Sequence, residues 1–111
     1  MTDRMLKLNR NIQRIWGEVM HKHADLPNDV MVTVSSVDTR PNLRSSTVWL
    51  YVFPVIKGEE VLAQLKPQMY KLQGLFNEEL QTNPLPRIIL RLDHGADYAE
   101  SITKKLDSLD E

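Results

Sequence analysis

The chain has 111 residues, a formal net charge of −1, and a composition of 41% hydrophobic and 26% charged residues. Folding at this length can remove roughly two-thirds of the surface from water, so one core can form without disulfide or metal crosslinks. Only four glycines and six prolines occur, which excludes a long disordered or collagen-like tract. The absence of cysteine excludes disulfides, thiolate zinc sites and cysteine nucleophiles, and the net charge lacks the cationic excess typical of nucleic-acid-binding proteins.

Charge is unevenly distributed along the chain. The amino-terminal part is rich in cations and the last residues are acidic: the cations are Arg4, Lys7, Arg10, Arg14 and Lys22, and the tail holds Asp107, Asp110 and Glu111. No apolar run of the signal-peptide kind follows the charged start, and no run of about eighteen apolar residues occurs anywhere. We therefore expect a cytosolic protein without membrane contact, folded as a single domain over residues 1–111.

Residues 4–24 predict an amphipathic helix. Apolar side chains recur three and four positions apart, which places them on one face: Leu8, Ile12, Ile15 and Val19. The same spacing gathers Lys7, Arg10 and Arg14 on the opposite face, which is either an ordinary solvated surface or a phosphate-binding one. Pro27 lies in the polar stretch that ends this helix.

Residues 30–37 and 47–53 predict two strands of a hairpin with a long polar connection. Alternation in the first strand places Val30, Val32 and Val34 on one face. The second strand is dense in β-branched and aromatic residues, and its inner face holds Val48, Leu50 and Val52. Its outer face then carries Trp49, Tyr51 and Phe53, and such a face needs a cover or a partner.

A second helical pattern covers residues 58–81, with apolar positions Leu62, Leu65, Met69, Leu72, Phe76 and Leu80. Pro67 and Gly74 interrupt it, so we expect a bend at one or both. A proline-rich stop precedes a third strand at 87–92, with Ile88, Leu90 and Leu92 inward and Arg87, Ile89 and Arg91 outward. A loop at 93–97 and a short closing helix at 98–109 complete the prediction.

Few residues suggest chemistry. His21 and His23 lie two positions apart, which points them to different sides of a helix, so we expect no metal site. His94 between Asp93 and Asp97 resembles a dyad, but turn-forming residues at a strand end have the same composition. With no glycine-rich phosphate loop and no nucleophile elbow, we expect no enzyme and no cofactor.

The outer sheet face combines aromatic rings with arginines, which are the two ingredients of single-stranded nucleic-acid recognition. It involves Trp49, Tyr51 and Phe53 with Arg87 and Arg91. The alternative is that these rings pack under the closing helix or in a dimer interface.

The predicted order of helix, strand, strand, helix, helix, strand is the topology of the type II KH domain, in an α+β fold. No two glycines lie three apart, so the usual Gly-x-x-Gly loop is absent. The chain resembles the ribosome-binding factor A (RbfA) family, which has this topology without that loop. The matching segments are Met31 to Asp38, Pro41-Asn42-Leu43, Thr47 to Val52, Gln73-Gly74 at the family's helix kink, and Pro84-Leu85-Pro86 leading to Leu92-Asp93.

This sequence departs from the family's pattern around the kink. It reads Leu72-Gln73-Gly74 where the family has Ala-x-Gly, and the following helix is about a turn shorter. The basic residues expected before the last strand are replaced by Gln81, Thr82 and Asn83.

The resemblance implies a non-catalytic factor that binds the immature small (30S) ribosomal subunit. It implies contact with 16S rRNA near the cleft between head and body, help in late maturation and precursor processing, cold-sensitive growth on loss, and release aided by a ribosome-associated GTPase. We expect a monomer, and the candidate RNA-contacting residues are Lys7, Arg10, Arg14, Arg40, Arg44, Lys71, Gln73 and Gly74. A protein-binding or self-associating module that uses the Trp49, Tyr51, Phe53 face is the alternative function, and an enzyme that depends on His94 is a third.

Overall fold

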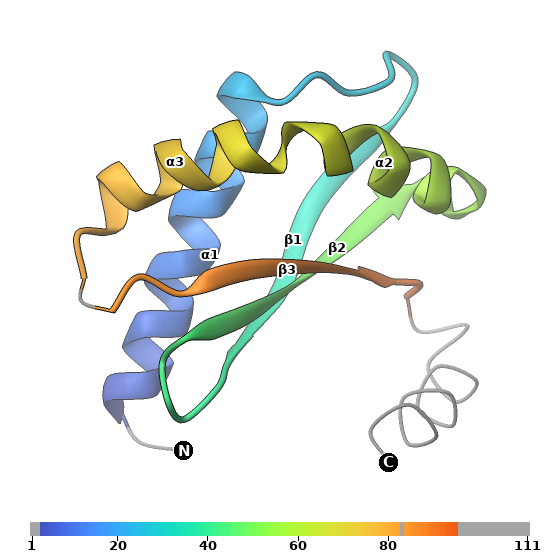
Figure 1. Ribbon diagram of the computed structural model, residues 1–111. Coiled ribbons are helices and arrows are strands. Elements are labelled where there is room, and N and C mark those ends of the chain that lie inside the picture. The colour runs from blue at the N-terminus through green and yellow to red at the C-terminus, as the bar shows by residue number, and fades with distance from the viewer. Residues whose placement is uncertain (1–2, 83, 96–111) are drawn as a thin grey trace.

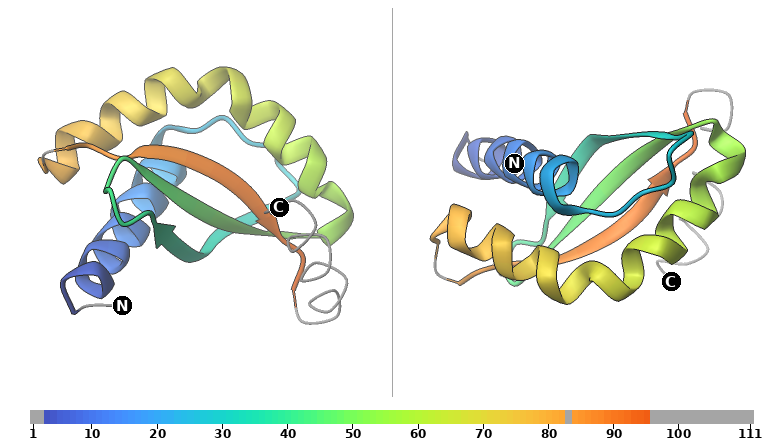
Figure 2. Two further views of the ribbon diagram at one scale, coloured as in Figure 1. Left: turned by 60° about the horizontal axis from the view of Figure 1, so that its bottom comes forward. Right: turned by 90° about the horizontal axis from the view of Figure 1, so that it is seen from above.

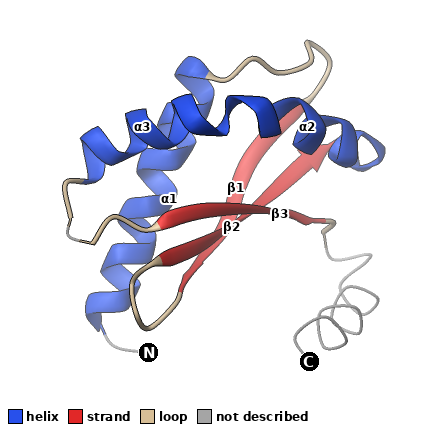
Figure 3. Cartoon of the chain, viewed as in Figure 1, coloured by secondary structure: helices blue, strands red, loops and turns tan. Residues whose placement is uncertain are grey.

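The structure, a computed structural model, describes residues 3–82 and 84–95. Its elements follow the predicted order (Figures 1 and 3): α1 (Asp3–His23), β1 (Met31–Thr39), β2 (Ser45–Phe53), the 3-10 turn η1 (Val55–Lys57), α2 (Gly58–Leu65), η2 (Lys66–Gln68), α3 (Met69–Leu80) and β3 (Arg87–Asp93). The sheet has the strand order β1-β2-β3, with β1 antiparallel and β3 parallel to β2. The type II KH order is therefore confirmed over these residues, whereas the predicted closing helix at 98–109 lies outside them.

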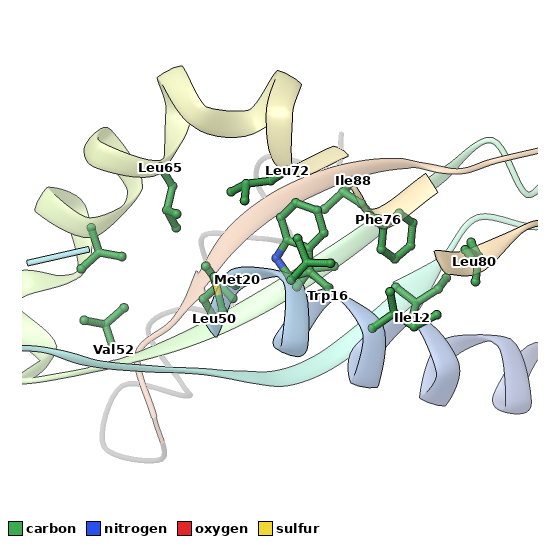
Figure 4. Close-up of a cluster of buried hydrophobic side chains, with 14 residues drawn as sticks. Ile12, Trp16, Met20, Leu50, Val52, Leu65, Leu72, Phe76, Leu80 and Ile88 are labelled. Atoms are coloured by element: carbon green, nitrogen blue, oxygen red, sulfur yellow. The ribbon is translucent and has the colours of Figure 1, made fainter. Parts of the chain in front are cut away.

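All the helices contribute to one core on the inner face of the sheet. Figure 4 shows Trp16 of α1 among Ile12, Leu50, Leu72 and Phe76, and its ring centroid lies 5.7 Å from that of Phe76 in an edge-to-face arrangement. Within the described residues, the Trp16 indole N–H is buried without an acceptor. The inward sides predicted for the second and third strands are confirmed, since Val48, Leu50, Val52 and Ile88 are buried in this cluster. Val32 and Val34 of β1 are partly buried against it.

A bulge in β1 corrects the predicted alternation of that strand. Val34 pairs with Leu50 and Ser36 pairs with Trp49, so Ser35 is the extra residue. The Ser35 hydroxyl donates to the Trp49 carbonyl (3.2 Å). Because of the bulge, Val34 and Val37 both pack on the core although an odd number of steps separates them.

The bend in the second helical segment lies at η2, where Pro67 interrupts the helix, so that part of the prediction is confirmed. Of the two predicted positions only Pro67 bends the chain, because α3 continues unbroken through Gly74. The kink that the resemblance placed at Gln73-Gly74 is therefore wrong, and the helix is interrupted at Lys66–Gln68 instead. The right-hand view of Figure 2 shows α2 and α3 following one arc alongside β3.

Two glutamine amides hold this arc in place. Gln68 accepts from the Asp25 N–H (2.7 Å) and donates to the Asp25 carbonyl (2.8 Å), which fixes the connection between α1 and β1. Gln73 accepts from the Ile88 N–H (2.9 Å) and donates to the Pro86 carbonyl (3.1 Å) and to Asn77 (3.0 Å). A side-chain amide offers one acceptor and a donor group, so it can pair with a backbone segment as a neighbouring strand would.

The outer face of the sheet lies opposite this core. Met31 and Phe53 are direct cross-strand neighbours there and are 65% and 58% exposed, whereas Trp49 and Tyr51 are partly buried. The chain turns after β3 at Gly95, whose φ of +86° favours glycine and where an added Cβ would lie 3.3 Å from the Tyr51 ring. Within the described residues, no helix combines the length and apolarity that crossing a membrane requires.

Candidate nucleic-acid interface

Three segments that are distant in the sequence meet at one end of the molecule, which we call the loop end. They are the first half of α1, the connection between β1 and β2, and the residues that lead into β3 (Figure 1). Arg4, Pro41 and Pro86, one from each segment, line the same pocket. The loop end is therefore a single surface built from three parts of the chain.

A buried polar chain ties α1 to the base of the β1–β2 connection. The Thr39 hydroxyl donates to Asn9 Oδ1 (2.5 Å) and lies 2.8 Å from the Ser46 hydroxyl. Because a hydroxyl has one hydrogen, Ser46 is the donor in the second bond. All three side chains are buried, so their hydrogen bonds replace water and fix the position of the helix on the hairpin.

The β1–β2 connection is itself an ordered turn. The Arg40 N–H donates to the Ser45 carbonyl (2.9 Å), the Leu43 N–H to the Arg40 carbonyl (2.8 Å), and the Arg44 N–H to Asn42 Oδ1 (2.9 Å). The Arg87 N–H then donates to the Arg44 carbonyl (2.9 Å), which joins the turn to the start of β3. The turn and β3 therefore form one framework for the arginines they carry.

Cations predominate at the loop end. The exposed cations of its three segments are Arg4, Lys7, Arg10, Arg40, Arg44 and Arg87, and the carboxylates of the described residues there are Asp3 and Asp38. None of these cations forms an ion pair within residues 3–82 and 84–95. Free guanidinium and ammonium groups of this kind attract phosphate and position it without reading sequence.

The other predicted arginine of α1 is differently placed. Arg14 lies 3.5 Å from Glu18 and donates to Asn11 Oδ1 (2.8 Å). Both partners of this ion pair are more than half exposed, and such pairs are weak, so the Arg14 guanidinium can exchange Glu18 for another anion.

Charges at the opposite end of the fold are paired. Lys57 Nζ lies 3.5 Å from Asp29 and 3.6 Å from Glu60. The negative charge of Asp29, and to a lesser extent that of Glu60, raises the pKa of Lys57 above its ordinary value. Lys57 is therefore paired with carboxylates, whereas the six loop-end cations named above form no ion pair with any described residue.

A groove of about 830 Å³ runs between the arc of α2 and α3 and strand β3. Gln73 and Gly74 line it, together with Lys66, Arg87 and apolar residues, and none of its lining residues in the described part of the chain carries a carboxylate. Lys71 is exposed on α3 but does not line this groove. An added Cβ at Gly74 would meet no heavy atom of another element within 4 Å, so α3 presents open backbone there.

The predicted RNA-contacting residues thus fall into three groups: Lys7, Arg10 and Arg14 on α1, Arg40 and Arg44 in the turn, and Lys71, Gln73 and Gly74 on α3. Of the third group, Gln73 contacts the loop end, because its amide donates to the Pro86 carbonyl. Sequence reasoning assigned Arg87 to the outer sheet face and Arg4 only to the cationic start of the chain. In the structure Arg87 joins the turn to the groove, and Arg4 lines the pocket beside the turn. The sequence signal that points to Arg87 is its position directly after Pro84-Leu85-Pro86, at the start of the third strand.

The three histidines lie outside the loop end. His21 and His23 are exposed in the last turn of α1, and no group of three or more potential metal ligands occurs in the described part of the chain. Asp93 accepts the Gly95 N–H (3.0 Å), which is the bond of a turn-forming aspartate, and Asp97 lies outside the described residues.

Comparison with known proteins agrees with this architecture. A family model described as ribosome-binding factor A matches residues 4–106. The chain belongs to the ribosome-binding factor A family. The resemblance carried by the strand, turn and proline segments is therefore confirmed.

Other ribosome-binding factor A proteins align along nearly the whole chain. That of Flavobacterium psychrophilum is 28% identical over 112 residues, covering 95% of this chain and 84% of that protein. That of Bdellovibrio bacteriovorus is 25% identical over 108 residues, covering 96% and 81%. The crystal structure of ribosome-binding factor A from Thermus thermophilus superposes with a TM-score of 0.70 at 18% identity, covering 79% of this chain and 94% of that one, which supports the KH-like fold.

Proposed function

We propose that this protein is a non-catalytic assembly factor of the small ribosomal subunit. In this proposal it binds the immature 30S subunit as a cytoplasmic monomer, contacts 16S rRNA near the cleft between head and body, and assists late maturation and precursor processing. A ribosome-associated GTPase aids its release, and its loss causes cold-sensitive growth. The observation that carries the proposal is the cationic loop end on a ribosome-binding factor A fold.

The loop end supplies the contacts. Lys7, Arg10 and Arg14 on α1 and Arg40 and Arg44 in the turn bind phosphates, with Lys71 as a further cation beside the groove. Gly74 lets an RNA backbone approach α3 closely. The donors of the Gln73 amide are used by Asn77 and Pro86, so Gln73 contributes by holding β3 against α3.

Sedimentation of a lysate on sucrose gradients at low and raised salt tests this function. The protein is expected to comigrate with free small subunits and to leave them as salt rises, because phosphate contacts release counterions. Arg10→Glu is expected to lower its share in the small-subunit fractions at least about tenfold, whereas Lys22→Glu, an equal charge change in the last turn of α1, has little effect. Sedimentation only at the top of the gradient under both conditions would refute the proposal.

Self-association is the second candidate, favoured by the exposed Met31 and Phe53 on the outer sheet face. It predicts a sedimentation coefficient that rises with concentration, that resists salt, and that returns to the monomer value in Phe53→Gln. Our proposal predicts a monomer at all concentrations, and analytical ultracentrifugation separates the two.

A further inference from the structure

The loop end contains a pocket that is distinct from the groove beside α3. It has a volume of about 390 Å³ and is lined by Arg4, Leu8, Pro41, Leu43, Pro84 and Pro86, among others. This volume falls in the range of about 300–1,000 Å³ that is usual for small-molecule sites. We call it the proline pocket.

The lining has a particular chemistry. Proline rings from the turn and from the approach to β3 face the same space as the leucine side chains, and among the residues that the structure describes Arg4 is the charged one in the lining and no carboxylate lines it. Rigid apolar walls accept a flat ring, and a guanidinium at the rim attracts an anion or a hydrogen-bond acceptor. An unpaired nucleobase combines these properties, since its faces are apolar, its edge carries acceptors, and phosphates flank it.

Cations lie on both sides of the pocket's turn wall. Arg40 precedes Pro41 and Arg44 follows Leu43, so each of the two turn residues that line the pocket has an exposed arginine as its chain neighbour. This arrangement matches a nucleotide whose base enters the pocket and whose phosphates stay outside. An apolar protein side chain in the pocket would offer these arginines no anionic group to bind.

The turn is also held in an unfavourable conformation. Leu43 has φ +62°, in the left-handed region that branched residues avoid, and the hydrogen bonds of Leu43 and Arg44 within the turn maintain it. Backbone conformations of this kind persist where the surroundings determine them, and they cluster at binding sites. Because Leu43 and Pro41 line the pocket, this turn holds one of its walls in a fixed conformation.

We propose that the proline pocket receives one unpaired nucleobase of the bound RNA, with Arg40 and Arg44 on the flanking phosphates. This proposal rests on the proposed function and deepens it, because it requires a single-stranded or bulged nucleotide at the contact. Affinity then has a salt-dependent part from the arginines and a part from the base that depends little on salt.

Three RNA hairpins of one sequence provide the test: one with a single bulged adenosine, one with an abasic residue at the bulge, and one fully paired. The hairpin with the bulged base is expected to bind at least about tenfold more tightly than the other two, and this ratio is expected to persist as salt rises. Fluorescence anisotropy measures each affinity.

Pocket-filling variants tie the effect to the site. Leu43→Trp adds bulk to the pocket, and Thr82→Trp does so from another wall without changing the turn. Both are expected to abolish discrimination between the hairpins and to weaken association with small subunits on the gradient. The matched control Leu85→Trp changes a residue that is 41% exposed and does not line the pocket, so it is expected to behave as the unmodified protein. Circular dichroism verifies that the variants fold.

Each other outcome overturns the inference. Equal affinity for the three hairpins, or discrimination that survives both filling variants, shows that no base enters the pocket while the proposed function stands. Loss of subunit association in the filling variants without hairpin discrimination assigns the pocket to a protein side chain instead. Absence of the unmodified protein from the small-subunit fractions refutes the proposed function itself.

Discussion

At the scale of single residues, side-chain amides replace backbone partners where the helical arc meets the rest of the fold. β3 is an edge strand of the described sheet. At its start, the Pro86 carbonyl and the Ile88 N–H form hydrogen bonds with the Gln73 side chain. Since one amide satisfies both groups, the start of β3 is fixed beside α3 without a fourth strand.

Gln73→Glu should reveal this role. A carboxylate still accepts the Ile88 N–H but cannot donate to Pro86 or Asn77, so we expect the free energy of unfolding to fall by about 1–3 kcal/mol. Urea denaturation measures the change. Gln81→Glu, the same substitution at an exposed position just after α3, should change it by less than about 0.5 kcal/mol.

Two helical glycines form a natural matched pair. At Gly17 in α1 and Gly74 in α3, an added Cβ would meet no heavy atom of another element within 4 Å, so alanine should stabilise each helix by about 0.5–1 kcal/mol. If RNA approaches α3 at Gly74, Gly74→Ala alone should also weaken association with small subunits. Thermal unfolding and gradient sedimentation of both variants check this, and equal association of the two would remove Gly74 from the interface.

At the scale of elements, the attachment of α1 to the hairpin sets the geometry of the loop end. The buried chain from Ser46 through Thr39 to Asn9 connects the helix that carries Lys7 and Arg10 to the turn. Polar groups this well satisfied tolerate little displacement, because any shift leaves a buried donor or acceptor unpaired.

Thr39→Val is the corresponding test. The substitution preserves shape but leaves the Asn9 carbonyl and the Ser46 hydroxyl without their shared partner, so we expect a loss of about 1–3 kcal/mol of stability. Thr33→Val, on the exposed face of the same strand, should cost less than about 0.5 kcal/mol. Chemical denaturation distinguishes them, and equal losses would mean that the buried chain contributes nothing specific.

Periodicity predicted most of these elements because each buries one face of a regular repeat. It could not locate the bulge at Ser35, although Val34 and Val37 both being apolar was the available signal. It also left open whether the bend lies at Pro67, at Gly74 or at both. An exposed helical glycine costs too little to break α3, whereas Pro67 removes a backbone donor and does break the helix.

The candidate site was less predictable than the fold. Lysines and arginines in the sequence carry no sign of which will share a surface, and contacts such as Arg44 with Arg87 arise only from the parallel pairing of β2 and β3. Similarly, the sequence does not indicate which group a side-chain amide will bind. It predicts Gln73 as an RNA contact, whereas in the structure the Gln73 amide donates to Asn77 and Pro86.

For the whole molecule, the arrangement of charge matters more than its sum. A net charge of −1 is compatible with an anionic partner because cations gather at the loop end. Carboxylates that offset these cations in the sum lie elsewhere in the sequence, among them those in the acidic tail and beside Lys57. Attraction over a distance of about 8–10 Å in salt depends on this local surface.

Two double substitutions that lower the net charge equally should therefore differ. Arg40→Glu with Arg44→Glu is expected to reduce affinity for small subunits at least about tenfold and to make its salt dependence shallower by about two in logarithmic slope. Lys22→Glu with Arg91→Glu, away from the loop end, should leave both nearly unchanged. Equal losses in quantitative pelleting assays would show that net charge, and not its position, governs binding.

The assembly of the loop end from three remote segments also has a consequence for the life of the chain in the cell. Arg4, Pro41 and Pro86 come together only in the folded chain, because Pro86 reaches the pocket through the long-range pairing of β3 with β2. A nascent or partly unfolded chain therefore lacks the surface altogether. If the loop end binds RNA as proposed, binding selects completely folded chains and lowers the population of opened chains that proteases remove.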